Sequence, residues 1–316
     1  MTMMSLRVAS KRCIAADVFM FELASANDTP LPSFGAGSHV TVLTPAGLTR
    51  RYSLCNSPRE NGSFRIAVKR EAMGGGGSMS LCDTVQAGDL LPTSEPLNYF
   101  PLANEASTHL LIAGGIGITP ILAMAQELQA RGADFRVVYL ARSQTDAPFA
   151  QELQEGPLAK HVMVHCTEGD AGRRLDLQAL LQAQPPGQHV YCCGPRQLMQ
   201  AVREHSAHWA AGSVHFEDFG TSEQPQASED RPFTVRLARS GRDLEVPCGT
   251  SILTVLRDAG IPAPSSCESG TCGSCRTTLL GGCVDHRDFV LDESEYDKEI
   301  MICVSRATSG LIELGL

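Results

Sequence analysis

The sequence lacks three features, and each absence excludes a class of protein. It has no excess of basic residues: 26 Lys and Arg against 35 Asp and Glu give a formal net charge of −9, which argues against nucleic-acid binding. The longest uncharged apolar stretch, residues 110–125, is too short to span a membrane and contains Pro120 and three glycines. The first residues lack the apolar run of a signal peptide. We therefore expect a cytoplasmic protein without a nucleic-acid or membrane partner.

The composition is that of a folded protein with several domains. Its 316 residues are enough for two or three domains of ordinary size. Hydrophobic residues make up 43% of the chain, which supports buried cores, and charged residues make up 19%, too few for a disordered chain. No internal repeat or low-complexity block is present beyond four glycines at 74–77. We expect a monomer.

Four of the twelve cysteines have a spacing that requires a ligand role. Cys267, Cys272 and Cys275 are spaced C-x4-C-x2-C, and Cys303 follows at a distance from which a returning strand could complete the set. This is the spacing of plant-type ferredoxins, in which four thiolates hold a [2Fe–2S] cluster.

The loop that carries three of these cysteines must curl tightly around the cluster, and Gly270 and Gly273 allow it to do so. Backbone N–H groups in such a loop point at the sulfurs and offset the negative charge. A structural zinc site is the first alternative, although zinc sites usually pair two short C-x2-C knuckles. Disulfides are the second, and they are typical of small secreted domains.

Residues 6–102 show short apolar stretches between Pro, Gly, Asn and Ser turns, which predicts an antiparallel β-barrel domain. The expected strands are Val18–Leu23, His39–Leu43, Arg51–Cys55 and Phe64–Lys69. One helix is expected at Ser78–Val85, with Ser78 as its cap.

Two features of this domain suit an anionic, planar ligand. Arg50 and Arg51 stand beside Tyr52 and Ser53, so that two guanidiniums accompany an aromatic ring and a hydroxyl. The glycines 74–77 precede the expected helix, and free N–H groups at a helix start make a phosphate site. A flexible loop is the other interpretation of such a glycine run.

From residue 108 onward strands alternate with helices, which predicts a doubly wound parallel sheet whose ligands lie beyond the carboxyl ends of its strands. The expected strands are His109–Ala113, Phe135–Leu140, Val162–His165, His189–Cys193 and Val214–Phe216. The expected helices are Pro120–Leu128, Pro148–Gln154, Leu177–Gln182 and Arg196–His205.

Two loops follow strands at that ligand edge. Residues 114–120, Gly-Gly-Ile-Gly-Ile-Thr-Pro, join the first strand to its helix, and their glycines would let a pyrophosphate approach the backbone. Pro120 stands where the third glycine of the dinucleotide fingerprint would be, and proline suits the first turn of a helix. The second loop, 192–195, is Cys-Cys-Gly-Pro. A structural turn is the alternative for each loop taken alone.

The C-terminal part begins after a polar, proline-bearing linker at 221–231. Beyond it we expect a small mixed sheet crossed by one helix, which is sufficient to hold a cluster at its edge. The expected strands are Phe233–Leu237, Leu244–Val246, Arg276–Leu280, Ile300–Val304 and Leu311–Leu314, and the expected helix is Ile252–Ala259.

The order of these parts resembles the phthalate dioxygenase reductase family, which includes the vanillate demethylase reductases. The resemblance covers essentially the whole chain. It implies a multidomain protein: an FMN-binding antiparallel β-barrel at 1–103, a doubly wound α/β NAD(P)-binding domain at 104–220, and a ferredoxin-like (β-grasp) [2Fe–2S] domain at 232–316.

The resemblance also implies roles for single residues. Arg50 would meet the flavin phosphate, Tyr52 would pack against the isoalloxazine, and Ser53 would hydrogen-bond near its reactive nitrogen. Further flavin-binding residues implied by the family are Ala67, Val68, Lys69, Gly76, Gly77, Ser78, Thr119 and Phe219. The implied nicotinamide-nucleotide residues are Gly115, Gly117, Thr119, Pro120, Cys193, Gly194 and Pro195. Gly75 departs from the pattern, because some members carry a positive residue there.

The choice between NADH and NADPH depends on the loop after the second parallel strand. A 2′-phosphate requires a basic pocket there, and Arg142 has no second basic residue nearby. Arg142 can equally stack on adenine, so we expect NADH and keep NADPH as the alternative.

These parts predict an electron relay. Nicotinamide releases two electrons as a hydride, a flavin accepts both, and the cluster accepts one at a time. Ser53 and Cys193 would hold the flavin and nicotinamide in reactive register. The family implies that the electrons leave for a Rieske-type oxygenase. The alternatives are a stand-alone NAD(P)H-dependent flavin, ferric or quinone reductase, and a redox sensor without turnover.

Overall fold

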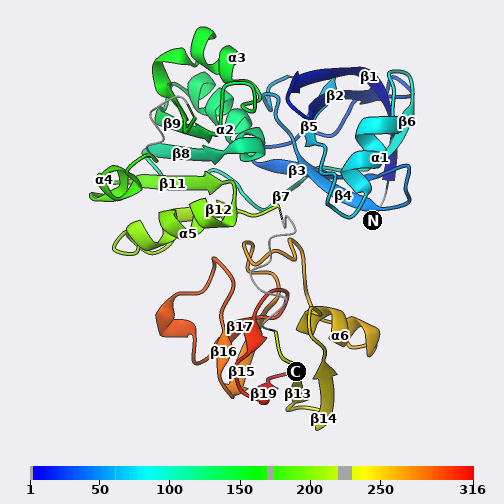
Figure 1. Cartoon of the computed structure of the whole chain (residues 1–316), viewed down its shortest axis with the longest axis vertical. Helices are drawn as coiled ribbons and strands as arrows, with labels where there is room; N and C mark the ends of the chain where they lie inside the picture. The colour runs from blue at the N-terminus through cyan, green and yellow to red at the C-terminus, as the bar shows by residue number, and fades with distance from the viewer. Residues whose placement is uncertain (1–2, 61, 169–173, 220–229) are drawn as a thin grey trace. The chain divides into compact units, whose positions relative to one another are not determined.

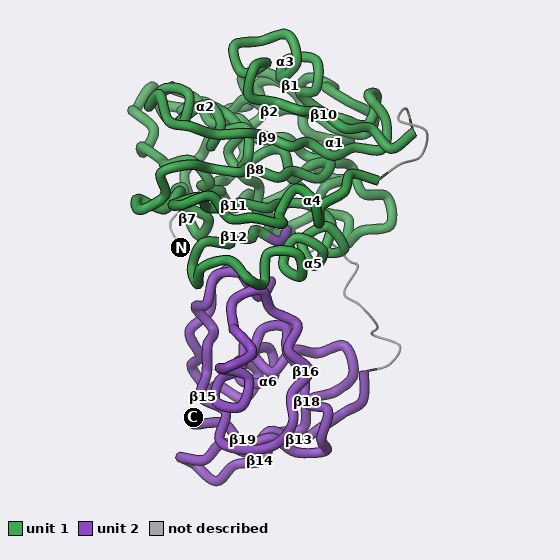
Figure 2. Tube along the Cα trace, turned by 90° about the vertical axis from the view of Figure 1, so that its left-hand side faces the viewer, with its two compact units in different colours: residues 1–217 green, residues 218–316 purple. Residues whose placement is uncertain are grey.

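The computed structural model describes residues 3–60, 62–168, 174–219 and 230–316. These residues form two compact units, 1–217 and 218–316, drawn in different colours in Figure 2. The predicted linker at 221–231 lies almost entirely outside the described residues. None of the helices within the described ranges is long and apolar enough to cross a membrane.

The first half of unit 1 is an antiparallel sheet in the strand order β4-β3-β6-β1-β2-β5, with β7 paired to β3 (Figure 1). Its strands are β1 Met3–Ala15, β2 Val18–Ser25, β3 Ser38–Leu43, β4 Thr49–Ser53, β5 Ser63–Lys69, β6 Leu90–Ser94 and β7 Leu97–Asn98. A bridge between Leu54 and Ile66 joins the two ends of this order, so the sheet closes as the predicted barrel.

Apolar side chains on alternate strand positions fill the barrel, because successive side chains point to opposite faces. Helix α1 (Gly77–Thr84) packs against the barrel and adds Leu81 and Cys82 to its core. Lys11 of β1 donates to the carbonyls of Cys82 and Val85 at the helix end, at 2.6 and 2.9 Å. These bonds satisfy carbonyls that have no partner within the helix.

The expectation that Ser78 caps α1 is wrong. The N-cap is Gly76, whose φ of 80° is left-handed, and no side chain of the described residues caps the helix. Ser78 lies in the first turn, and its hydroxyl accepts a hydrogen bond from Glu71 N at 3.1 Å. Glycine adopts the left-handed conformation without cost, so the glycine run itself forms the helix start.

The second half of unit 1 is a five-stranded parallel sheet in the order β10-β9-β8-β11-β12. Its strands are β8 Thr108–Gly114, β9 Asp134–Ala141, β10 Val162–Cys166, β11 Gln188–Cys193 and β12 Val214–Glu217. Its helices are α2 Ile118–Arg131, α3 Ala150–Glu155, α4 Leu177–Leu181 and α5 Arg196–His205. Figure 1 shows α2 and α3 on one side of the sheet and α5 on the other, which confirms the doubly wound arrangement.

Unit 2 contains a five-stranded mixed sheet, in the order β14-β13-β19-β15-β17, packed against helix α6. These elements are β13 Phe233–Leu237, β14 Arg242–Val246, α6 Ile252–Asp258, β15 Arg276–Gly281, β17 Glu299–Met301 and β19 Leu311–Leu314. A separate ladder pairs β16 (Val284–Asp285) with β18 (Arg306–Ala307). The small mixed sheet with one helix is confirmed.

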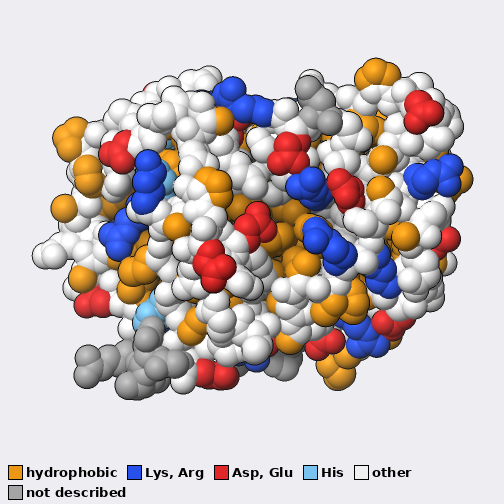
Figure 3. Space-filling model, turned by 90° about the horizontal axis from the view of Figure 1, so that it is seen from above, with side chains coloured by type: hydrophobic (Ala, Val, Ile, Leu, Met, Phe, Trp, Pro, Cys, Tyr) orange, Lys and Arg blue, Asp and Glu red, His pale blue; other side chains and the backbone are white. Residues whose placement is uncertain are grey.

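Sequence patterns misplaced or missed several strands. β1 and β6 were not predicted, and the strand expected at Arg51–Cys55 is Thr49–Ser53. The strand expected at Ile300–Val304 ends at Met301, because the chain turns there to bring Cys303 to the cluster loop. On the face drawn in Figure 3, basic and acidic side chains are interspersed rather than gathered by sign.

Candidate functional site

The structure brings the two predicted halves of a phosphate site together in the barrel. The Arg50 side chain lies against the glycine run and donates to the Gly75 carbonyl at 3.2 Å. A Cβ on Gly77 would stand 2.8 Å from Arg50 Cγ and Nε, so only glycine lets the arginine lie so close to the helix start. A guanidinium beside the N-terminus of α1 is suited to a phosphate.

The next strand residues carry the groups expected to face an isoalloxazine. The Tyr52 hydroxyl is buried without a hydrogen-bond partner among the described residues, and this burial raises its pKa. Such an orphaned hydroxyl fits a polar group of a bound ligand. Ser53 is buried, and its hydroxyl donates to Glu217 Oε2 at 3.1 Å.

Glu217 was missed by the sequence analysis, although it ends β12 at the ligand edge of the sheet. It stands 164 residues from Ser53 in sequence, so no local pattern could pair them. The hydrogen bond places a carboxylate of the nucleotide sheet on a hydroxyl of the barrel. The contact can orient the hydroxyl and can carry a proton.

Residues Ala67–Lys69 lie in strand β5. Their burial and pairing restrict which of their atoms could contact a ligand. Val68 is fully buried in the barrel core, so a ligand contact from it would come from its backbone. Ala67 is 5% exposed, and Lys69 is paired with Glu71 at 2.7 Å.

Two glycine-containing loops meet at the carboxyl ends of adjacent strands, as predicted. β8 and β11 are paired in parallel, with Ala113 opposite Cys193. A Cβ on Gly117 would stand 2.2 Å from the Cys193 carbonyl oxygen, and a Cβ on Gly194 would stand 2.9 Å from Gly114 N. The backbones of the two loops are therefore in direct contact at this edge of the sheet.

Further predicted nucleotide residues lie at this edge. Thr119 is buried in the first turn of α2, and its hydroxyl donates to Ile116 O at 3.1 Å. Pro120 follows within that turn, as predicted. Cys193 is 0% exposed in the core beneath α2, so the loop presents the half-buried Gly194 and the exposed Pro195 rather than the Cys193 thiol.

For Arg142 and Phe219, the described part of the chain shows no side-chain partner that defines a role, so their predicted roles stay predictions. Arg142 is exposed after β9. Next to it, the Ser143 hydroxyl donates to Asp146 Oδ2 at 2.8 Å, so a carboxylate stands beside the expected adenosine site. Phe219 follows β12 and is 38% exposed. Its predicted cover of the flavin stays a prediction.

The four predicted ligand cysteines, all in unit 2, form two pairs. Cys275 Sγ and Cys303 Sγ lie 3.1 Å apart, and Cys272 Sγ accepts a hydrogen bond from Cys267 N at 3.4 Å. In the described part of the chain no three candidate ligand side chains surround a single point. A [2Fe–2S] cluster takes two sulfurs for each iron, so a donor set in two pairs fits it.

The loop around Cys267 is shaped as the glycines predicted. Gly270 and Gly273 both have φ of 79°. Ser269 N and Thr271 N donate to Cys267 Sγ at 3.4 and 3.5 Å. The hydrogen bond between the two thiols lowers the pKa of Cys267 and raises that of Cys272, and the backbone bonds from Ser269 and Thr271 lower the pKa of Cys267 further. Such backbone bonds favour a thiolate at Cys267.

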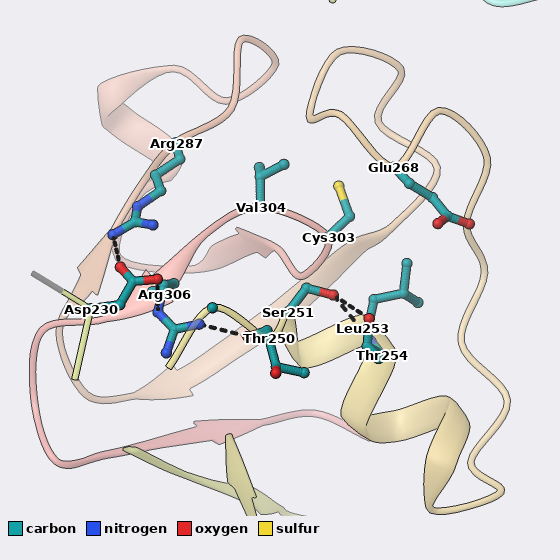
Figure 4. A pocket seen from close by; sticks show the side chains of 11 residues that line it. Asp230, Thr250, Ser251, Leu253, Thr254, Glu268, Arg287, Cys303, Val304 and Arg306 are labelled. Carbon is teal, nitrogen blue, oxygen red and sulfur yellow. Dashed lines mark hydrogen bonds and ion pairs between the residues drawn. The ribbon is translucent and has the colours of Figure 1, made fainter. Parts of the chain in front are cut away.

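A polar pocket of 320 Å³ lies beside Cys303 (Figure 4). On one side of it the Asp230 carboxylate accepts from Arg287 Nη2 at 2.8 Å and pairs with Arg306 Nε at 3.2 Å. Arg306 also donates to the Thr250 carbonyl at 2.6 Å. Because Arg306 is three residues from Cys303, these bonds fix the chain next to the turn that carries the fourth sulfur.

Three family models match the chain. They are the oxidoreductase FAD-binding domain at 5–100, the dimethylamine monooxygenase subunit DmmA-like N-terminal domain at 93–212, and the 2Fe-2S iron-sulfur cluster binding domain at 235–308. The first and third match the barrel and unit 2 described above.

Whole proteins are similar over nearly the full chain. Phthalate dioxygenase reductase of Burkholderia cepacia is 48% identical, over 98% of this chain and 97% of that protein. The solved structure of a phthalate dioxygenase reductase matches with a TM-score of 0.73 and 47% identity, over 99% of this chain and 98% of that one. A type IV self-sufficient cytochrome P450 monooxygenase is 37% identical with a TM-score of 0.74, and this chain matches 41% of its length.

The barrel with Arg50 beside the start of α1, the parallel sheet with two contacting loops and the paired cysteines agree with these similarities. The predicted fold class and flavin and iron–sulfur domains are confirmed. The chain belongs to the phthalate dioxygenase reductase family of iron–sulfur flavoprotein oxidoreductases.

Proposed function

We propose that this chain is the reductase component of a Rieske-type oxygenase system and that it delivers electrons from NADH to that oxygenase. The observation that carries the proposal is that one chain combines the Ser53–Glu217 contact at a nucleotide edge with paired cysteines in a ferredoxin-like unit. A flavin, when bound, accepts a hydride and returns its electrons singly, and a [2Fe–2S] cluster carries one electron at a time.

The residues of the chain do the positioning. Arg50 and the start of α1 would bind a flavin phosphate, and the Tyr52 hydroxyl would gain the partner that the described residues do not supply. Ser53, held by Glu217, would fix the orientation of the ring, and the contacting loops at Gly117 and Cys193 would present a nicotinamide nucleotide from the other side. Holding the reacting groups in register is the main contribution to rate in such a site.

We propose FMN as the flavin. One guanidinium and one helix start suit a single phosphate, which FMN carries at its end. The matching family model is described as FAD-binding, so identifying the flavin extracted from the purified protein tests this choice directly. FAD in the extract would overturn it.

We propose NADH as the electron donor. The Asp146 carboxylate, bonded to the Ser143 hydroxyl at 2.8 Å, would repel a 2′-phosphate in the loop after β9. Arg142 is then available to stack on adenine. The ratio of kcat/KM for NADH to that for NADPH tests the proposal, and a ratio below one would overturn it.

The acceptor is tested by removing one cluster ligand. Cys272→Ala should keep NADH oxidation by ferricyanide, which takes electrons without the cluster, and should abolish electron delivery to a Rieske-type oxygenase. Cys283→Ala is the matched control, because Cys283 is an exposed cysteine of the same unit outside the four-cysteine set. Delivery that survives in Cys272→Ala would refute the role of the cluster.

The similarity to a self-sufficient cytochrome P450 supports a second candidate acceptor, a haem oxygenase. Parallel assays with a Rieske oxygenase and a P450 haem domain separate the two. We also propose that the protein is a cytoplasmic monomer with domain boundaries near 103, 220 and 232. Light scattering of the purified protein tests its oligomeric state.

A further inference from the structure

A buried carboxylate on helix α2 of the parallel-sheet half forms an ion pair with an arginine of the barrel half. Glu127 lies near the end of α2 among apolar core residues and is 7% exposed. Both of its oxygens accept hydrogen bonds from Arg59: Oε2 from Nε at 3.0 Å and Oε1 from Nη2 at 3.2 Å. Arg131, one helical turn further along α2, donates Nε to Oε1 at 2.7 Å.

Arg59 belongs to the segment that continues the flavin strand β4. The base of that segment is fixed, because buried Asn56 donates to Ser63 O at 3.1 Å and accepts from Arg65 N at 2.9 Å. Ser57 supports the next turn, since its hydroxyl accepts from Arg59 N at 3.3 Å. The turn that carries the Arg59 guanidinium to Glu127 is therefore held in place by hydrogen bonds.

Each residue of this ion pair is close in sequence to one half of the expected reaction site, the flavin strand or the nucleotide loop. Arg59 is six residues beyond Ser53, and Glu127 is eight residues beyond Thr119 on a single helix. At 1.5 Å per residue that helix spans about 12 Å between Thr119 and Glu127. Because a helix is rigid over this length, a bond at Glu127 fixes the position of the nucleotide loop.

We propose that Arg59 and Glu127 are positioning residues that hold the nucleotide loop in register with the flavin strand. The inference rests on the proposed hydride transfer from NADH to flavin. A bidentate guanidinium–carboxylate pair fixes both distance and angle, which apolar contacts between the same elements do not. Neither residue contacts the reacting atoms. Their effect on the rate is indirect.

Arg131 provides a matched control. It donates to the same carboxylate, but it lies on the same helix as Glu127, so it joins no second element. Removing Arg59 leaves Glu127 paired with Arg131, and removing Arg131 leaves it paired with Arg59. Each variant therefore keeps a partner for the buried carboxylate, and both should fold.

The first test compares Arg59→Met with Arg131→Met in anaerobic stopped-flow reduction of the flavin by NADH. We expect hydride transfer to slow by about tenfold in Arg59→Met and by less than about twofold in Arg131→Met, with similar melting temperatures. Arg59→Lys keeps the charge without the two-point contact and should fall between. Equal rates in Arg59→Met and Arg131→Met, or an unchanged rate in Arg59→Met, would overturn the proposal.

The second test does not depend on turnover. Amide hydrogen exchange of the purified protein should increase at 55–60 and at 114–120 in Arg59→Met, and only near the end of α2 in Arg131→Met. The same exchange pattern in both variants would refute the positioning role. If the wild-type protein oxidises neither NADH nor NADPH, the proposed function fails, and the exchange comparison still decides whether the pair joins the two elements.

Discussion

Replacing Gly117 with alanine should slow hydride transfer about a hundredfold. The added Cβ would stand 2.2 Å from the Cys193 carbonyl oxygen, 2.5 Å from its carbonyl carbon and 2.8 Å from Gly194 N. Ordinary carbon–oxygen contacts are about 3.3–3.6 Å, so the two loops must separate by roughly 1 Å. A displacement of that size at a reaction site costs about 10²-fold in rate.

The backbone of Gly117 makes this substitution a clean steric test. Its φ of −62° and ψ of −4° are available to alanine, so the substitution adds no backbone strain, and the nearest atoms to the new methyl group all belong to the second loop. The atoms that it meets are backbone atoms of a sheet-bound loop and cannot rotate away. The crowding should also destabilise the fold by about 1–3 kcal/mol.

The assay is anaerobic stopped-flow reduction of the bound flavin at saturating NADH, with thermal unfolding measured on the same samples. Gly132→Asn is the control, because Gly132 is the left-handed C-cap of the same helix and an added Cβ there meets nothing within 4 Å. Asparagine tolerates that conformation, so this variant should react at the wild-type rate. A Gly117→Ala enzyme within threefold of wild type would refute the steric reasoning.

Three further predictions concern single side chains. Gly77→Ala should weaken flavin binding by about tenfold, near 1.4 kcal/mol, because the added Cβ displaces the Arg50 side chain. Fluorescence titration of the apoprotein with flavin measures the affinity, and an unchanged affinity would contradict the prediction. Burial and the neighbouring His189 lower the pKa of His215 from 6.5 to about 4. As the pH falls from 6.5 towards 4, the unfolded chain is protonated at His215 while the folded chain is not, so the free energy of unfolding decreases over this range. Between pH 7 and pH 4, the free energy of unfolding measured in urea should therefore fall by about 3 kcal/mol less in His215→Gln than in the wild type. The same pH dependence of this free energy in both proteins would contradict the lowered pKa. Asp146→Ser should raise kcat/KM for NADPH about tenfold with little change for NADH, and no gain for NADPH would remove Asp146 from nucleotide selection.

The sequence predicted the features that depend on local pattern. The cysteine spacing led to the loop in which Gly270 and Gly273 are left-handed, and the apolar strands of the nucleotide domain predicted its parallel sheet. The glycine run predicted where the helix starts but not which residue caps it. Serine is a preferred N-cap residue, whereas Gly76 takes the N-cap position because it can adopt the left-handed conformation.

Contacts between distant segments were beyond the sequence. Ser53 and Glu217 are 164 residues apart, and Arg59 and Glu127 are 68 apart, so both pairs depend on how the barrel and the parallel sheet pack. β1 was missed because its polar residues interrupt the alternation, and its 13 residues are held by pairing to both β2 and β6. Tertiary pairing overrides weak local preference in such a strand.

Stepwise anaerobic reduction with NADH, followed by absorbance and electron paramagnetic resonance, tests the relay most directly. We predict one flavin, about two irons and two labile sulfides per chain, and uptake of about three electrons, one of which gives the signal of a reduced [2Fe–2S] cluster. In a Cys303→Ala variant that signal should vanish while NADH still bleaches the flavin. A colourless protein, or one with a single zinc at these cysteines, would contradict the account.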